Sequence, residues 1–93
     1  MLIAGAGTDR LNGGHGDDVF VFNANIRGTA IVEDFNMADG EADILRFENG
    51  NRQATLASAR QQGSDVVLQH GEMTVIVEQT TLAQFWENET LFV

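Results

Sequence analysis

The chain has 93 residues, enough for one small domain whose hydrophobic core is marginal without further support. It contains no cysteine, so disulfide bonds and thiolate metal sites are excluded. Its net charge of -9 argues against nucleic acid and anionic membrane surfaces as partners and favours a cation. No apolar run approaches the ~18 residues that a membrane span requires.

The stretch from Ala4 to Phe22 contains a nine-residue repeat. The matching pairs, nine positions apart, are Gly5 and Gly14, Gly7 and Gly16, Asp9 and Asp18, and Leu11 and Phe20. Glycines at alternate positions let the backbone adopt positive φ and coil tightly, so that carbonyl oxygens point into one concavity. A carboxylate closes that concavity, and calcium prefers such a set of oxygen ligands. The repeat therefore predicts calcium-binding loops.

This spacing resembles the nonapeptide G-G-x-G-x-D-x-U-x of RTX, or haemolysin-type calcium-binding, proteins. Ala4 stands in place of the first glycine, so the first copy is the weaker one. The resemblance implies that each nonapeptide forms a loop followed by a short strand. Two nonapeptides, eighteen residues, would then complete one turn of a short parallel β-roll.

In such a roll, an ion bridges loops that stack on one side, eighteen residues apart. For the second loop this window contains Asp34, whereas the window of the first loop, 23–27, offers side-chain oxygens only from Asn23 and Asn25. The glycine-rich segments, including His15, would contribute their main-chain carbonyls. The expected metal ligands are Gly5, Ala6, Gly7, Asp9, Gly13, Gly14, His15, Gly16, Asp18 and Asp34.

Further along the chain, strands are expected at 2–3, 10–11, 19–22, 30–35 and 44–47. Residues 53–62 fit either a helix or a strand, and the neighbouring hairpins favour a strand. Two β-branched runs, 66–68 and 73–77, predict a hairpin whose turn exposes His70. Thr80 or Thr81 would cap a helical turn at 82–85. The expected fold is a single all-β domain, with a β-roll over 1–35 and an antiparallel, sandwich-like cap over 36–93.

The second half extends the family resemblance. Residues 18–22, 31–35 and 43–47 are similar to the segments that follow the last repeat in secreted RTX proteases of the serralysin type. The end of the chain, acids followed by Leu91-Phe92-Val93, resembles the C-terminal signal of type I secretion. The resemblance implies the C-terminal part of a bacterial, extracellular protein that the type I secretion machinery exports. The domain before it could be a protease, lipase, adhesin or epimerase.

Two rival motifs lack residues that they require. A dinucleotide-binding loop would need a third glycine where Arg10 stands. An EF-hand starting at Asp34 would need glycine at Asp39 and glutamate at Leu45. The acids of the loop 36–43 are then either a solvated turn or, for Asp39 and Asp43, additional calcium ligands.

Two functions follow from these observations. The first is a non-catalytic module that folds on binding calcium, because no metalloprotease helix, nucleophile elbow or Cys/His pair is present. The alternative is an ancillary module that binds an alginate-like polysaccharide, similar to the R-modules of alginate epimerases. That alternative needs arginines gathered on one face, and the five arginines are spread along the sequence.

Overall fold

The computed structural model describes residues 1–12, 18–33, 35, 43–87 and 92–93. Strands account for 49% of the described residues, and each of the two helices has six residues. The expectation of a mostly β protein with little helix is therefore confirmed. No helix among the described residues is long and apolar enough to cross a membrane.

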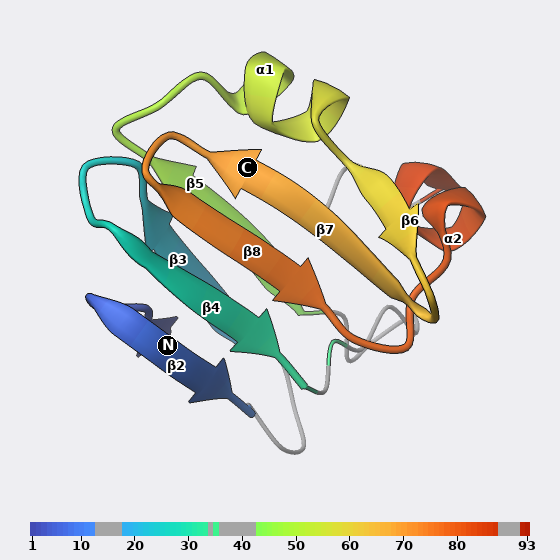
Figure 1. Ribbon diagram of the computed structural model, residues 1–93, viewed down its shortest axis with the longest axis horizontal. Helices are drawn as coiled ribbons and strands as arrows, with labels where there is room; N and C mark the ends of the chain where they lie inside the picture. Colours follow the sequence, from blue (N-terminus) through green and yellow to red (C-terminus); the bar gives the residue numbers. More distant parts are fainter. Residues whose placement is uncertain (13–17, 34, 36–42, 88–91) are drawn as a thin grey trace.

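The described strands form two sheets that face each other (Figure 1). The three-stranded sheet has the order β1 (Leu2–Ile3), β3 (Val19–Asn23), β5 (Ile44–Glu48). The five-stranded sheet has the order β2 (Gly7–Leu11), β4 (Gly28–Val32), β8 (Met73–Val77), β7 (Asp65–His70), β6 (Arg60–Gln62). Strands β1 to β5 thus alternate between the two sheets as the chain advances.

Neighbouring strands of this alternating part are parallel, but their spacing along the chain grows. Leu2 lies opposite Phe20, eighteen positions later, which is the spacing expected for two nonapeptides. Gly7 lies opposite Gly28, twenty-one positions later, and Val19 lies opposite Ile44, twenty-five positions later. The repeat therefore sets the first pairing, while longer connections separate the later ones.

The second half is less antiparallel than expected. Strand β5 extends the first sheet in parallel with β3, and β8 pairs in parallel with β4. Only β6, β7 and β8 pair with one another in antiparallel fashion, through turns at 63–64 and 71–72. The hairpin predicted from the two β-branched runs is confirmed as β7 and β8.

The segment 53–62, for which a strand was favoured, begins as a helix, α1 (Arg52–Ala57), and only ends as β6. Asn51 caps α1, because its side-chain oxygen accepts a hydrogen bond from the main-chain N–H of Ala54 at 3.2 Å. Leu56 and Thr55 face the core and are buried. The cap and these two buried residues explain why this segment starts as a helix.

A second helix, α2 (Leu82–Glu87), confirms the predicted helical turn. Its cap is Thr81, whose Oγ1 accepts a hydrogen bond from the N–H of Gln84 at 3.1 Å. Gln84 returns the contact, since its Oε1 accepts from the N–H of Thr81 at 3.0 Å. This reciprocal arrangement is a capping box, which fixes the start of the helix.

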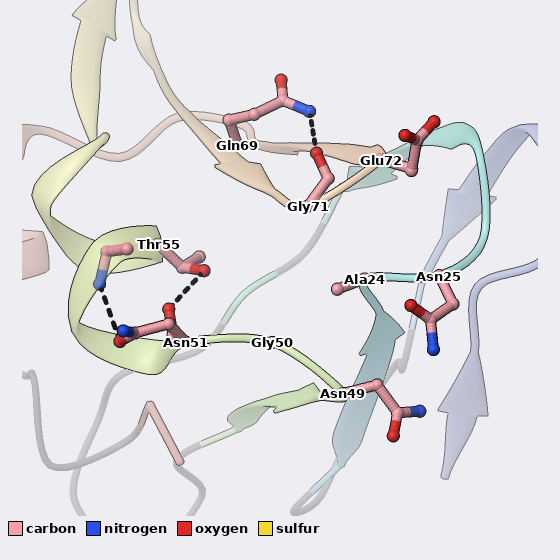
Figure 2. A pocket seen from close by; sticks show the side chains of 10 residues that line it. Ala24, Asn25, Asn49, Gly50, Asn51, Thr55, Gln69, Gly71 and Glu72 are labelled. Carbon is pink, nitrogen blue, oxygen red and sulfur yellow. Dashed lines mark hydrogen bonds between the residues drawn. The ribbon is translucent and has the colours of Figure 1, made fainter.

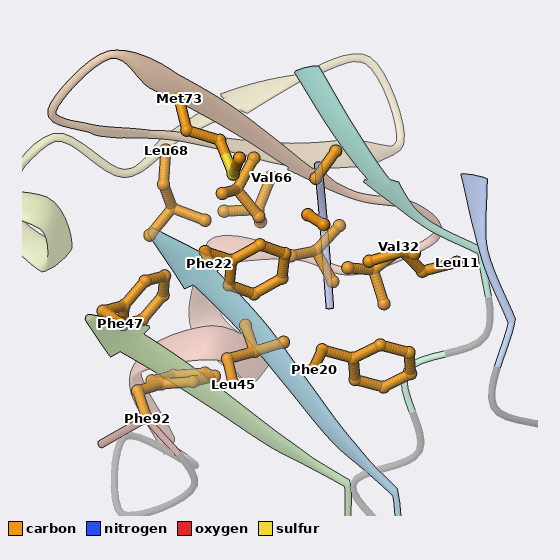
Figure 3. Packing of buried hydrophobic residues seen from close by; sticks show 14 of the residues in the cluster. Leu11, Phe20, Phe22, Val32, Leu45, Phe47, Val66, Leu68, Met73 and Phe92 are labelled. Carbon is orange, nitrogen blue, oxygen red and sulfur yellow. The ribbon is translucent and has the colours of Figure 1, made fainter. Parts of the chain in front are cut away.

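The hydrophobic core lies between the two sheets (Figure 3). Alternate residues of each strand point inward, as the two-residue period of a strand requires. The inward residues labelled there are Phe20, Phe22, Leu45 and Phe47 of the three-stranded sheet, and Leu11, Val32, Val66, Leu68 and Met73 of the five-stranded sheet. Phe92 joins them: its ring stacks on that of Phe85, with 4.2 Å between the centroids.

Candidate metal centre

The first predicted loop, between β1 and β2, brings two main-chain carbonyl oxygens together. Gly7 adopts a φ of 82°, which favours glycine. A methyl group added at Gly28, on the neighbouring strand, would lie 2.6 Å from the oxygen of Gly7 and 2.9 Å from that of Gly5. These two oxygens therefore converge beside Gly28, in the manner expected of a carbonyl-lined loop. Ala6, between them, is exposed.

The side chain of Asp9 bends back onto this same loop. Its Oδ2 accepts a hydrogen bond from the main-chain N–H of Gly5 at 2.9 Å. Oδ2 of Asp9 thus stabilises the loop through this hydrogen bond. The other carboxylate oxygen of Asp9, Oδ1, takes no part in it. Asn23 is expected to offer a side-chain oxygen opposite this loop. In the structure its Oδ1 accepts a hydrogen bond from the main-chain N–H of Asn25 at 2.9 Å.

Of the second predicted site, only Asp18 is described. Gly13, Gly14, His15, Gly16 and Asp34 lie outside the described residues. Asp18 is followed directly by β3, and the residue that precedes the neighbouring strand β5 is Asp43. The main-chain N–H of Asp18 donates to Oδ1 of Asp43 at 3.0 Å, and the carbonyl of Asp18 accepts from the N–H of Ile44 at 2.8 Å.

Both acids are withdrawn from solvent. Asp43 is fully buried. Oδ2 of Asp18 is also buried and has no hydrogen-bond partner among the residues that the structure describes. A buried carboxylate oxygen without a donor costs free energy, because it has lost water and gained nothing in return. A cation with a preference for oxygen ligands would satisfy it.

The described residues supply only part of a complete ligand set. Within them, no group of three or more His, Asp or Glu side chains could hold a metal ion. They offer two partial sets of oxygen ligands: Oδ2 of Asp18 beside Asp43, and the converging carbonyl oxygens of Gly5 and Gly7. Both features are oxygen-only, and oxygen donors without nitrogen or sulfur suit calcium better than zinc or copper.

Asp43 is the residue whose partnership the sequence interpretation missed. The spacing of eighteen pointed from the second loop to Asp34, whereas the actual offset at this place is twenty-five. A signal was present, because the segments 18–22 and 43–47, DVFVF and DILRF, align with an aspartate directly before an apolar strand. Aligning these two segments by their pattern would have paired the two acids.

Three loops surround a depression of about 400 Å³ near the ends of β3, β5 and β7 (Figure 2). They contribute Ala24 and Asn25, then the segment 49–51, and finally Gly71 and Glu72. Gly71 has a φ of 60°, and a methyl group there would lie 2.5 Å from the Cβ of Ala24. Close packing of glycine against alanine therefore joins two of these loops.

His70 lies beneath this depression and is buried, contrary to the exposed position expected for it. Val66, Leu68 and His70 are two positions apart along β7, so their side chains lie on the same face of the strand. This face points into the core, and the ring of His70 is therefore buried. Nε2 donates to the carbonyl oxygen of Glu48 at 2.8 Å, and Nδ1 lies 2.7 Å from Oγ1 of Thr55. His70 thereby links β7, β5 and α1.

Three arginines of the described residues form ion pairs at separate places on the surface. Arg10 pairs with Glu33 at 2.7 Å, and Arg27 pairs with Glu72 at 3.1 Å. Arg46 pairs with Glu48 at 3.2 Å. These three pairs lie on different elements, so the charges of Arg10, Arg27 and Arg46 are balanced locally rather than gathered for a polyanionic ligand.

Comparison with known proteins adds no relative. The chain matches no protein-family model, no curated protein and no solved structure.

Proposed function

We propose that the protein is a calcium-binding β-roll module that folds on binding calcium and serves as the C-terminal folding and secretion domain of a type I-secreted, extracellular bacterial protein. The observation that carries the proposal is Oδ2 of Asp18, which is buried without a donor in the described part of the chain and belongs to a glycine- and aspartate-rich repeat. A carboxylate in that position is stabilised by a cation more than by any neutral group.

The arrangement of the strands supports the β-roll part of the proposal. Strands β1 to β5 alternate between two sheets and pair in parallel within each sheet. The spacing of eighteen residues between β1 and β3 equals two nonapeptides. Such a stack puts the loops of successive turns next to one another, where an ion can bridge them.

Two sets of residues would hold calcium. One is Asp18 with Asp43, together with the carbonyls of Gly13–Gly16 and with Asp34, which the repeat pattern indicates. The other is the carbonyls of Gly5 and Gly7 with the remaining oxygen of Asp9. When bound, calcium supplies positive charge that offsets the burial of the carboxylates.

The charge of the chain supports a folding switch. Fourteen acids against five arginines leave a net charge of -9, which opposes compaction when no cation is present. Extracellular calcium modules have dissociation constants of about 10⁻⁴–10⁻³ M, well above cytosolic calcium. The chain would therefore remain loosely folded before export and become compact outside the cell, because metal-binding energy is then folding energy.

A calcium titration of the 93-residue protein tests the proposal. Circular dichroism and calorimetry are recorded in chelator and at rising calcium, with magnesium at the same ionic strength as the matched control. We expect β signal and melting temperature to rise at about 10⁻⁴–10⁻³ M calcium and to stay unchanged in magnesium, which demands a smaller octahedral site. No rise up to about 10 mM calcium, tenfold above that range, would refute the calcium function.

A further inference from the structure

Residues 92–93 form a docked segment that lies along one edge of β5. The N–H of Phe47 donates to the carbonyl oxygen of Val93 at 2.8 Å, and the N–H of Val93 donates to the carbonyl oxygen of Leu45 at 2.9 Å. Phe92 forms a parallel bridge with Leu45 and is 1% exposed, with its ring in the core (Figure 3). The docked segment therefore takes its main-chain pairing from β5.

The other edge of β5 is joined to the predicted calcium ligands. Asp43 directly precedes β5, and its Oδ1 accepts a hydrogen bond from the N–H of Asp18 at 3.0 Å. Ile44, the first residue of β5, donates to the carbonyl oxygen of Asp18 at 2.8 Å. From there β5 pairs with β3 along its whole length. One strand thus lies between the proposed calcium ligands and the docked segment.

Aromatic rings connect the same two places through side chains. The ring of Phe92 stacks on that of Phe35, with 6.0 Å between the centroids. Phe35 in turn meets the ring of Phe20 in an edge contact, with 6.5 Å between the centroids. Phe20 belongs to β3, two residues after Asp18, and is fully buried. Both main-chain and side-chain contacts therefore lead from the docked segment to the strand that follows Asp18.

We propose that calcium binding at Asp18 and Asp43 and docking of residues 92–93 on β5 stabilise each other, an inference that rests on the proposed calcium function. A calcium ion bound by both carboxylates would fix the starts of β3 and β5 relative to each other. Strand β5 would then hold the docked segment more firmly, and by thermodynamic reciprocity docking would tighten calcium binding by the same factor. Phe92 and Val93 belong to the stretch that resembles a type I secretion signal. Calcium would therefore withdraw these two residues from the export machinery.

Arg52 allows the coupling to be tested away from the proposed ligands. It lies at the start of α1, and its Nε donates to the carbonyl oxygen of Phe92. Arg52→Gln should loosen the docked segment and raise the calcium dissociation constant at least about fivefold in isothermal titration calorimetry. Arg60→Gln is the matched control, because it removes the same charge from an exposed position on β6, in the other sheet. It should leave calcium binding unchanged or slightly tighter, since losing a positive charge favours a cation.

Hydrogen exchange of the Phe47 amide measures docking directly, because this N–H donates to Val93. An opening that also releases the ion becomes rarer as calcium rises. In the folded wild-type protein, the protection of Phe47 should therefore increase about tenfold for each tenfold rise in calcium. The N–H of Glu78, which donates to Val32 in the five-stranded sheet, is the reference for global unfolding and should stay better protected than Phe47.

The outcomes separate the coupling from the calcium function itself. If calcium raises the melting temperature but Phe47 protection does not vary with calcium, the calcium function stands and the coupling is overturned. Equal calcium affinities in the two arginine variants overturn the coupling in the same way. A wild-type chain without any calcium response refutes both. Circular dichroism establishes that the variants are folded, and the exchange of Phe47 in the wild-type protein decides the matter if Arg52→Gln is not.

Discussion

The main-chain N–H of Asp18 donates to Oδ1 of Asp43 at 3.0 Å, which joins two acidic residues that are twenty-five positions apart. The carbonyl oxygen of Asp18 also accepts a hydrogen bond from the N–H of Ile44, so two hydrogen bonds join Asp18 to residues 43–44. Oδ2 of the Asp18 carboxylate is buried, and no donor from the described residues reaches it. The proposed calcium ion would supply the positive charge that this oxygen lacks.

The first prediction concerns Asp18→Asn. Without calcium, the substitution removes a buried negative charge beside Asp43 and should stabilise the protein by about 1–3 kcal/mol. With calcium, it should reduce the gain in melting temperature, because a charged ligand is lost. The two opposite effects are measured by calorimetry in chelator and in about 10 mM calcium, tenfold above the expected affinity range.

Glu87→Gln serves as the control for that experiment, since it removes the same charge from an exposed position on α2. It should change neither the stability in chelator nor the calcium response by more than about 0.5 kcal/mol. If Asp18→Asn lowers stability in chelator and leaves the calcium gain intact, the buried oxygen is not a cation ligand.

The second prediction concerns Gly28→Ala. The added methyl group would lie 2.6 Å from the carbonyl oxygen of Gly7, so the first loop must shift, at a cost of about 1–3 kcal/mol. Gly63→Ala is the matched control, because Gly63 has a φ of 62° but open space around it. It should cost about 1–2 kcal/mol through backbone strain. Calcium titrations of both variants should show a weakened response only for Gly28→Ala, and equal responses would remove the first loop from the binding site.

The third prediction tests the link made by His70. Thr55→Val keeps the shape of the side chain but removes the hydroxyl, which lies 2.7 Å from Nδ1 of His70 and donates to the carbonyl oxygen of Asn51 at 3.0 Å, so a buried polar atom is left unsatisfied. The free energy of unfolding in urea should fall by about 1–3 kcal/mol with an unchanged m value. Thr74→Val, whose hydroxyl contacts only the exposed Gln69, should change it by no more than about 0.5 kcal/mol. Equal effects would mean that the link contributes nothing.

The fourth prediction concerns the C-terminal aromatic contact. Phe92 is 1% exposed and stacks on Phe85, so Phe92→Ala should cost about 3–5 kcal/mol. Val93→Ala, which keeps the main-chain pairing of a half-exposed residue, should cost about 0.5 kcal/mol or less. A double-mutant cycle with Phe85→Ala should give a coupling of about 0.5–1.5 kcal/mol. Zero coupling would show that the two rings do not support each other.

Local patterns predicted much of this architecture. The β-branched runs predicted the hairpin of β7 and β8, and Thr81 was one of two candidates for the cap of α2. The pairing of Leu2 with Phe20 has the spacing of eighteen residues that two nonapeptides predict. Each of these features depends on residues within one turn of structure or one repeat, where propensity and period dominate.

Other features could not be predicted, because they depend on contacts between distant segments. Nothing near His70 in the sequence shows that Glu48 and Thr55 contact its ring, and its position beside a turn predicts exposure. Asp43 is separated from Asp18 by connections whose length breaks the repeat, so a fixed spacing selected Asp34 instead. In both places, loop length rather than residue type decides which side chains meet.

The parallel pairing of β4 with β8 also constrains when the chain can fold. Gly28 lies opposite Met73, forty-five positions later, so the five-stranded sheet gains its central ladder only after residue 77 has been made. Contacts that close such long stretches are slow to form. During synthesis, β4 would therefore stay without its β8 partner while the forty residues between the two strands are added.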